Sequence, residues 1–516
     1  MYVLLIFFSI LFLSYYYHLS TKIKRTPPIN WPVLGMLPGL LSHRNRVHEF
    51  LTDVLRQNGG TFMFKGPWFG NMDMLITCDP ANVHYILSKN FPNFTKGRDF
   101  REIFEGLGDG IFVAEFESWE RQRKICMSLL NQAGFQEFVG RTTWRKVESG
   151  LIPILEHFSE SGMEVDIQEL FQRLSFDCSC ILILGHDPAS LCIELPYLPE
   201  EKAFASSEEA VLRRHTLPGS LWKLERWLQI GKEKKLTEAK KIHDRFLSYC
   251  MSLKCQKNDE SVQFLTDDND HDHDLDLLTS YMRLEQAEKG DHSDAPSNIV
   301  SEQTWKDTML NLIFAGKDTV SASLTWFFWL LATNPVVENK IRGEISTNLP
   351  VCETGKWQAS DADKLKKLVY LHGALCESLR LFPPVGLQHK APVEPDTLPS
   401  GHRIDPNTKT VLSFYSMGRM ESIWGRDCLE FNPGRWINSD QGRQRIKTEP
   451  SFKFTAFNAG PRSCLGKEMS FLQLKIVAAS IIRGFKFDVI KNHPICPSSS
   501  VILHMKHGLK MKVSKC

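Results

Sequence analysis

One cysteine in a glycine-bounded loop near the C-terminus is the feature that most constrains this chain. Residues 457–466 read Phe-Asn-Ala-Gly-Pro-Arg-Ser-Cys-Leu-Gly, so Cys464 comes just before a helical pattern that begins around Lys467. Unpaired backbone N–H groups at a helix N-terminus stabilise negative charge and lower the pKa of a nearby thiol. Gly460 and Gly466 allow the backbone to turn tightly and to approach a flat ligand. The pattern therefore predicts that Cys464 is ionised and binds a metal.

The spacing F-x-x-G-x-R-x-C-x-G resembles the haem-binding loop of the cytochrome P450 superfamily. The resemblance implies that Cys464 is the axial ligand of the iron of haem b, and a thiolate ligand favours O–O cleavage. Arg462 precedes the cysteine by two residues and could pair with a haem propionate. Together with Phe457, Gly460 and Gly466, it would form the cofactor-binding loop.

A second match lies in a long apolar helix expected from about residue 301 to 332, where residues 315–319 read Ala-Gly-Lys-Asp-Thr. A mid-helix glycine costs about 1 kcal/mol relative to alanine, so we interpret it as a local loosening that makes room for dioxygen. The resemblance implies that Thr319 relays protons, that Asp318 feeds them inward and that Ala315 lines the substrate pocket. Close helix packing is the alternative explanation. The family usually has a second hydroxyl where this chain has Val320, so the relay would depend on Thr319.

A third match is the pair Glu377 and Arg380, which share one helix face because they are three residues apart. The segment 431–436, Phe-Asn-Pro-Gly-Arg-Trp, resembles the loop that supplies a second arginine, here Arg435, to the same glutamate. The three residues would form a buried charge network that stabilises the core near Cys464. The family commonly has a glutamate where this chain has Gly434.

Weaker matches concern the haem propionates and the substrate. Trp119 and Arg123 lie four residues apart on one expected helix face, and His389 follows a double proline; the resemblance assigns all three to propionate contacts. Residues 385–388, Val-Gly-Leu-Gln, would line the substrate pocket through Val385, Leu387 and Gln388. The amide of Gln388 departs from the more apolar pattern of the family and offers a partner to a polar group of the substrate.

The expected fold class is mainly α with small β-sheets (α+β), the cytochrome P450 fold, preceded by an N-terminal transmembrane helix. Residues 61–65 and 72–77 alternate like the strands of a hairpin. The run 266–274, rich in Asp and His, lacks defined ligand spacing and is interpreted as a solvated loop. Helical periodicity is expected over residues 118–135, 140–185, 202–255, 301–333, 335–348 and 465–485.

The N-terminus predicts a membrane anchor. Residues 2–19 carry no charge, and about 18 apolar residues are just enough to cross a bilayer. Lys22, Lys24 and Arg25 follow, so the remainder should stay cytosolic. A cleaved signal peptide would carry its charge on the other side. We therefore expect an anchor at residues 1–20, a basic and proline-rich hinge at 21–42 and a catalytic domain at 43–516, located at the endoplasmic reticulum membrane with a single pass.

Composition excludes several other classes. A net charge of +2 over 516 residues gives no sign of a nucleic-acid surface. The 13 cysteines show neither paired disulfide spacing nor a zinc pattern, which indicates a reducing compartment.

The resemblance implies an enzyme that activates dioxygen to oxidise a lipophilic substrate. The chain has no flavin or nicotinamide fingerprint, so electrons should come from an NADPH-dependent flavoprotein reductase. An acidic partner of this kind could bind a basic face expected from Arg121, Lys124, Arg141, Arg145 and Lys467.

Two further segments, residues 415–427 and 505–510, resemble the corresponding segments of the plant fatty-acid and alkane hydroxylases. The match is best with the midchain-alkane-hydroxylase-like subgroup. This resemblance implies hydroxylation of a long-chain aliphatic compound. The alternative is an oxidase of specialised metabolism, such as one that couples two phenol rings of an alkaloid precursor. A haem-binding protein without enzymatic activity is the hypothesis from another class.

Overall fold

The computed structural model describes residues 9, 12, 28–261, 275–290, 301–349, 362–440, 443–498 and 500–516. This part of the chain is mainly helical, with small sheets, which confirms the predicted fold class in its coarse form. The predicted anchor at residues 1–20 and the polar run 266–274 lie almost entirely outside the described residues.

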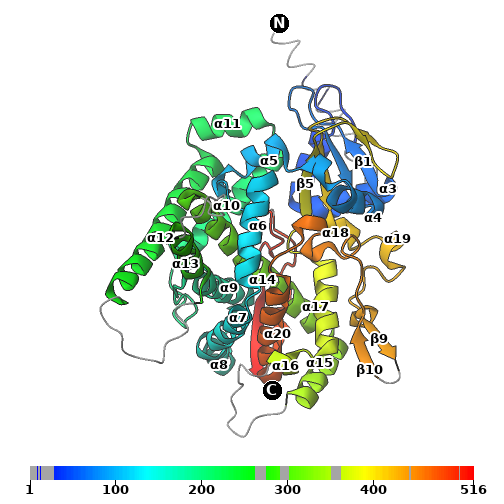
Figure 1. Ribbon diagram of the computed structural model, residues 1–516. Coiled ribbons are helices and arrows are strands. Elements are labelled where there is room, and N and C mark those ends of the chain that lie inside the picture. The colour runs from blue at the N-terminus through cyan, green and yellow to red at the C-terminus, as the bar shows by residue number, and fades with distance from the viewer. Residues whose placement is uncertain are drawn as a thin grey trace.

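The longer helices surround a central pair, α14 and α20, as Figure 1 shows. They are α3 (Val47–Gln57), α6 (Phe116–Leu130), α7 (Ala133–Lys146), α8 (Ile152–Ser161), α9 (Ile167–Leu184), α10 (Pro199–Thr216), α11 (Gly219–Trp227), α12 (Gly231–Ser261), α13 (Leu277–Gly290), α14 (Glu302–Thr333), α15 (Pro335–Asn348), α17 (Val369–Leu381) and α20 (Lys467–Gly484). The shorter helices are α2 (Leu37–Ser42), α4 (Pro80–His84), α5 (Gly97–Ile103), α16 (Ala362–Leu365), α18 (Phe414–Met417) and α19 (Glu421–Trp424).

Strands gather mainly at one end of the molecule, near α3 and α4 (Figure 1). The largest sheet has the order β1-β2-β8-β5-β3, in which β2 and β8 run parallel and the other pairs run antiparallel. Its strands are β1 (Thr61–Phe64), β2 (Met74–Thr77), β8 (Lys409–Ser413), β5 (Leu387–Pro392) and β3 (Phe94–Thr95). The smaller sheets are formed by β11 (Phe485–Val489), β12 (Lys510–Lys515) and β4 (Val165–Asp166), by β9 (Ile437–Asp440) and β10 (Arg443–Ile446), and by β6 (Asp396–Thr397) and β7 (Arg403–Ile404). The antiparallel pairing of β1 with β2 confirms the predicted hairpin.

Helix α14 is buried along most of its length and packs closely against α9. Gly316 lies at this interface, where an added Cβ would come within 2.8 Å of the Ser179 hydroxyl. The helix is α-helical throughout residues 315–319. Close packing therefore accounts for the mid-helix glycine, and the expected local loosening of the helix is not observed.

Three expected helices are divided in the structure. The range 118–135 is interrupted by the break between α6 and α7. The range 140–185 is interrupted after α8, where Gly162 adopts a left-handed conformation with φ of 66°, and α9 begins anew because Asp166 caps the N–H of Gln168. The range 202–255 is interrupted at Pro218, which lacks the N–H that a continuing helix needs, and at Gly231, which has a φ of 60°. Glycine and proline residues at the turns in the latter two ranges thus end helices that the apolar periodicity alone predicted to continue.

Among the described residues, no single helix is both long and apolar enough to cross a bilayer. Only α14 and α15, taken together, meet that requirement of length and composition, and they are bent by 109°.

Candidate functional site

The cysteine loop is a tight turn that ends at the first residue of α20. The Cys464 N–H donates to the Phe457 carbonyl at 2.8 Å, which closes the loop. Gly460 has a φ of 66°, and a Cβ there would lie 1.8 Å from the Leu87 carbonyl oxygen. No other residue type fits this position without moving the backbone. The loop therefore fixes the sulfur near the N-terminus of α20, as the sequence predicts.

The charge state predicted for Cys464 needs correction. Part of the side chain is exposed, but the atoms packed around the sulfur solvate it poorly, and this burial raises the pKa of the thiol. The N–H of Gly466 and the charges of Arg123 and Lys467 lower the pKa only in part. The protein alone does not ionise this cysteine. A coordinated metal ion does so, because it replaces the proton directly.

The two arginines predicted for the cofactor lie against one indole ring. Arg462 stacks over Trp119 with a distance of 4.5 Å to the ring centroid, and Arg123 lies over the same ring at 5.7 Å. Arg123 also donates to the Ser463 carbonyl at 3.0 Å, which ties α6 to the cysteine loop. The structure thus brings Trp119, Arg123, Arg462 and Cys464 together.

Arg462 belongs to a buried group of cations that sequence reasoning missed. Lys96 and Lys390 are 3% and 0% exposed, and the carboxylate of Glu115 contacts Arg462 at 3.5 Å. Burial and the charge of Arg462 lower the pKa of Lys390 to about 7. Burial and the two neighbouring cations lower the pKa of Lys96 well below its usual range. Three basic side chains thus lie near one carboxylate, and burial favours the uncharged form of both lysines.

The excess of basic side chains over carboxylates in this group bears on whether the residues fit haem. Buried basic groups stay charged only when anions balance them, and the two propionates of haem b would supply two negative charges. The Nε of Arg462 and the Nδ1 of His389 are buried and have no hydrogen-bond partner among the described residues. Burial and the nearby cations lower the pKa of His389 well below its usual range, so its ring is neutral and can donate one hydrogen bond. The residues fit the cofactor.

Thr319 lies on α14, where its hydroxyl donates to the Ala315 carbonyl at 2.6 Å. Ala315 is exposed although most of its helix is buried, so this turn borders open space. Val320, in contrast, is buried in the core. The hydroxyl of Thr319 therefore lies on the part of α14 that borders open space, whereas the side chain of Val320 contributes packing only.

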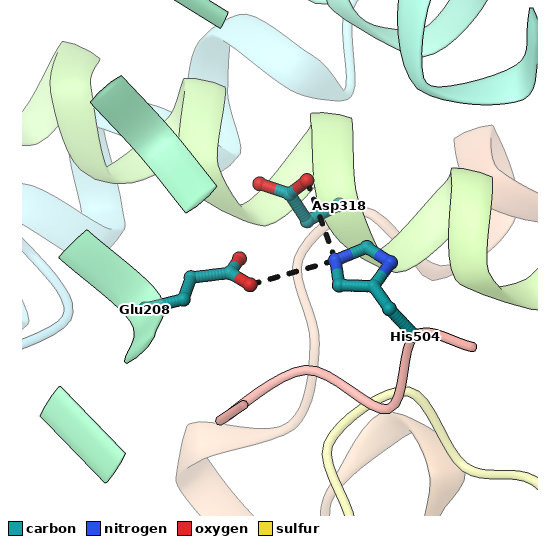
Figure 2. Close-up of side chains that lie close together, drawn as sticks. All are labelled: Glu208, Asp318 and His504. Carbon is teal, nitrogen blue, oxygen red and sulfur yellow. Dashed lines mark ion pairs between the residues drawn. The ribbon is translucent and has the colours of Figure 1, made fainter. Parts of the chain in front are cut away.

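Asp318 is held in a buried ion-pair cluster that the sequence did not predict (Figure 2). Lys317 contacts its Oδ1 at 2.5 Å, and the Nε2 of His504 lies 3.6 Å from the same oxygen and 3.4 Å from Oε2 of Glu208. Ser500 donates to that oxygen of Glu208 at 2.8 Å. The cluster joins α10, α14 and the loop before β12.

The charges of this cluster change the role expected for Asp318. Burial opposes ionisation, but Lys317 and His504 outweigh it and hold the pKa of Asp318 well below its usual range. Burial alone would lower the pKa of His504, yet the ion pairs with Asp318 and Glu208 raise it to about 9. Asp318 is thus a carboxylate, and the proton at neutral pH lies on His504. Glu208, Asp318 and His504 are close enough to share a metal ion, but the ammonium of Lys317 already neutralises Asp318.

The charge network predicted around Glu377 is present. Arg380 donates to both carboxylate oxygens at 2.7 and 2.8 Å, and Arg435 approaches Oε1 at 3.4 Å. Trp436 and the backbone N–H of Asn432 complete the coordination at 2.8 and 3.1 Å. The side chains of Glu377 and Arg380 are 0% and 1% exposed. The network ties α17 to the segment before β9, and Gly434 takes no part in it.

A pocket between the largest sheet, α3, α5 and α10 contains three of the four predicted substrate residues, Val385, Leu387 and Gln388. The fourth, Ala315, does not line it. Aliphatic and aromatic side chains make up most of the wall, which suits a lipophilic ligand. The apolar wall includes Leu51, Phe64, Phe100, Phe104, Phe112 and Val501.

The class of protein follows from this arrangement and from its relatives. A cysteine loop beside a cationic carboxylate-binding group and a threonine-bearing helix defines a haem-thiolate oxygenase. Residues 25–513 match the family model "Cytochrome P450", and the chain belongs to this family. It is therefore a cytochrome P450 monooxygenase with a haem-thiolate cofactor.

Named relatives are found among plant enzymes. The chain is 41% identical over 515 residues to alkane hydroxylase MAH1 of Arabidopsis thaliana. The aligned region covers 100% of this chain and 98% of that protein. It is 40% identical over 492 residues to cytochrome P450 86B1 of the same plant, covering 94% and 85%. It is also 37% identical over 493 residues to noroxomaritidine synthase of Narcissus aff. pseudonarcissus MK-2014, covering 95% and 91%.

Proposed function

We propose that the chain is a membrane-anchored monooxygenase that uses Cys464 as the axial haem ligand and hydroxylates a long-chain aliphatic compound. The apolar wall of the pocket carries this proposal, because a lipophilic substrate is the ligand that such a wall stabilises. The identity to an alkane hydroxylase along the full chain agrees with it.

Each group of site residues has a separate role in the proposed reaction. When bound, haem activates dioxygen with two electrons supplied by a partner. Arg123, Arg462 and His389 would hold its carboxylates, with Lys96 and Lys390 as further basic partners. The hydroxyl of Thr319 passes a proton toward the reacting oxygen, and Val320 offers no second route. The pocket orients the substrate and excludes water.

The electron donor is proposed to be an NADPH-dependent flavoprotein reductase. Arg121, Lys124, Arg145 and Lys467 are exposed on α6, α7 and α20, the helices that lie beside the cysteine loop. Such a basic face attracts an acidic partner. Opposite charges on the two proteins would speed their encounter at low salt.

The membrane location is proposed from the uncharged N-terminal segment and the basic cluster after it. The end of α11 and the turn after it add an exposed apolar surface, where Trp227 is 79% exposed. Large exposed apolar patches mark contact surfaces, membranes among them. The neighbouring exposed residues are Leu221, Leu224, Leu228 and Ile230.

The test is spectroscopic and then chemical. The reduced protein under carbon monoxide should show the long-wavelength band of thiolate-ligated haem, and Cys464→Ala should abolish it. A retained band in that variant would overturn the assignment of the ligand. Binding spectra with alkanes, fatty acids and phenolic amines would then identify the substrate class.

Oxidative coupling of phenols is the second candidate, and the amide of Gln388 in the pocket favours it. The identity to noroxomaritidine synthase agrees with this candidate. Coupling removes two hydrogens and inserts no oxygen, whereas hydroxylation inserts one atom of dioxygen. The mass of the product formed under labelled dioxygen therefore distinguishes them.

A further inference from the structure

Neutral polar side chains line the apolar pocket between the large sheet and α10. Three of them are His48 of α3, His215 of α10 and Gln388 of β5. Thr216 and Ser500, which also line it, donate hydrogen bonds to described residues, and His389 is assigned to the cofactor. Polar groups in such a place are normally hydrogen-bonded, and each exception requires an explanation. Sequence reasoning identified Gln388 alone.

His48 is 4% exposed, and neither of its ring nitrogens has a hydrogen-bond partner. Burial and the charge of Arg419 lower its pKa to about 4, so the ring is neutral at physiological pH. A neutral imidazole offers one donor and one acceptor. Both are unused by the described part of the chain.

His215 has a defined free nitrogen. Its Nδ1 lies 3.0 Å from the Val211 carbonyl and donates to it, because a carbonyl can only accept. Burial lowers the pKa of His215 to about 4, so its Nε2 carries no proton. This nitrogen is an acceptor and has no partner among the described residues.

Gln388 adds donors. Its side chain is buried, with 8% of the residue exposed, and its amide makes no hydrogen bond to a described residue. The backbone of Gln388 pairs with Leu412 in the sheet, which fixes the position of the side chain. The amide offers two donors and one acceptor to the pocket.

The wall of the pocket holds no unpaired charge. Lys409 is the one charged residue among those that line it, and it lies 3.0 Å from the carboxylate of Asp99. A substrate carboxylate or ammonium would enter without a counter-ion, at the full cost of desolvation. Charged lipids are therefore disfavoured, and so is a bare hydrocarbon, which leaves three polar groups unsatisfied.

We propose that this pocket selects an uncharged lipophile that carries a hydroxyl or carbonyl oxygen, with Gln388, His215 and His48 as the residues that determine the selection. The inference rests on the proposed function and narrows its substrate class. An oxygenated aliphatic chain and a phenol share this chemistry. A site built to hydrogen-bond an oxygen discriminates strongly against the analogue that lacks it.

Matched probes test the inference on the full-length haem-loaded protein. The pairs are dodecane with 1-dodecanol and biphenyl with 4-hydroxybiphenyl, and dodecanoate serves as the charged probe. Binding is measured by equilibrium dialysis, which does not depend on how a ligand affects the iron. One hydrogen bond to a neutral partner should give the hydroxylated member an advantage of about tenfold in affinity. Dodecanoate should bind more weakly than 1-dodecanol.

The variants Gln388→Leu and His215→Phe keep the wall filled but remove the hydrogen bonds. Each should reduce the hydroxyl preference while leaving the affinity for the bare hydrocarbon similar or higher. Val501→Ala is the matched control, because it removes apolar contact from the same wall and should weaken both members of a pair equally.

Failure of this inference can be distinguished from failure of the proposed function. If wild-type protein binds both members of each pair equally, the inference is overturned, whatever the variants do. A preference that survives in both variants overturns the assignment of these residues. Loss of the thiolate band in wild-type protein would instead contradict the proposed function and leave the probe comparison without a haem enzyme to describe.

Discussion

The Nε2 of His504 lies 3.6 Å from Oδ1 of Asp318, inside the protein and next to Thr319 (Figure 2). The loop before β12 thus reaches the functional turn of α14. Glu208 and Lys317 face the same pair, Glu201 lies 3.6 Å from Lys317, and burial together with the charge of Lys317 lowers the pKa of His243. The proton balance at Asp318 is therefore set by residues from three elements, α10, α14 and this loop.

His504→Gln should reduce stability most at neutral and acidic pH. The folded pKa of His504, about 9, exceeds its ordinary value of 6.5. Its contribution is therefore fully present below pH 6.5 and is lost as pH rises through about 9. The difference in unfolding free energy between wild type and variant should reach at most about 3 kcal/mol and shrink at alkaline pH. Denaturant unfolding from pH 6 to 9.5 measures it, and a pH-independent difference would contradict the ion pair.

Glu377→Gln should give a poorly folded protein with little haem. The substitution keeps the shape of the side chain but leaves Arg380 as a buried cation without its counter-charge, which costs about 3–5 kcal/mol. Haem content and the denaturation midpoint are the measurements. Glu338→Gln is the control, because its partner Arg342 is part-exposed and the loss should stay below about 1 kcal/mol. Equal effects of the two variants would remove the special role of the Glu377 network.

Thr319→Ala should keep haem and ligand binding but divert electrons to peroxide. In the proposed mechanism the hydroxyl carries the proton at this turn, and the side chain of Val320, which has no hydroxyl, cannot replace it. Proton-transfer groups contribute about 10²–10⁴-fold, so product formed per NADPH should fall severely. Thr319→Ser restores a hydroxyl and should recover much of the coupling. Full coupling in the alanine variant would show that protons arrive by another route.

Lys390→Met should weaken haem retention without unfolding the protein. Removal of one buried cation leaves fewer charges for the haem carboxylates, and a charge-assisted hydrogen bond contributes about 1.5–3 kcal/mol. Transfer of haem to an excess of apomyoglobin should therefore be roughly tenfold faster or more. Lys409→Met is the control on the adjacent strand, where Asp99 neutralises the lysine. Unchanged transfer in Lys390→Met would mean that this lysine does not face a carboxylate of the cofactor.

Deletion of residues 1–22 should weaken membrane association while the carbon monoxide spectrum stays intact. The proline-rich stretch after the proposed anchor should separate it from the folded part of the chain. Flotation with microsomal lipid vesicles measures the association. Release of the full-length protein by salt alone would argue against an inserted helix.

The parts of the site that depend on local spacing could be predicted from the sequence. Glu377 and Arg380 share one helix turn, and the glycines around Cys464 fix a short loop, so the motif contains the geometry. Lys96 and Lys390 could not be found in this way. Strand pairing of β3 with β5 brings their segments together across almost 300 residues of sequence, and a lysine within a buried strand was the available signal.

The charge states were the least predictable part of the site. The helix N-terminus suggested an ionised Cys464, but the effect of desolvation is larger. Asp318 was expected to carry protons, yet Lys317 beside it and His504 from a distant loop keep it ionised. A sequence motif specifies which groups are present, whereas the pKa of each group depends on burial and on neighbours that only the fold brings close.

The loop before β12 has a consequence for how enzymes of this kind diversify. Ser500 and Val501 line the pocket, and His504 lies on the same loop, anchored by the bond from Trp326 to the Leu503 carbonyl at 2.6 Å. A substitution that reshapes this wall for a new substrate also displaces the imidazole that balances Asp318. Substrate range and the charge balance at Asp318 therefore cannot change independently here, and a change of substrate through this loop will call for a second, compensating change on α10 or α14.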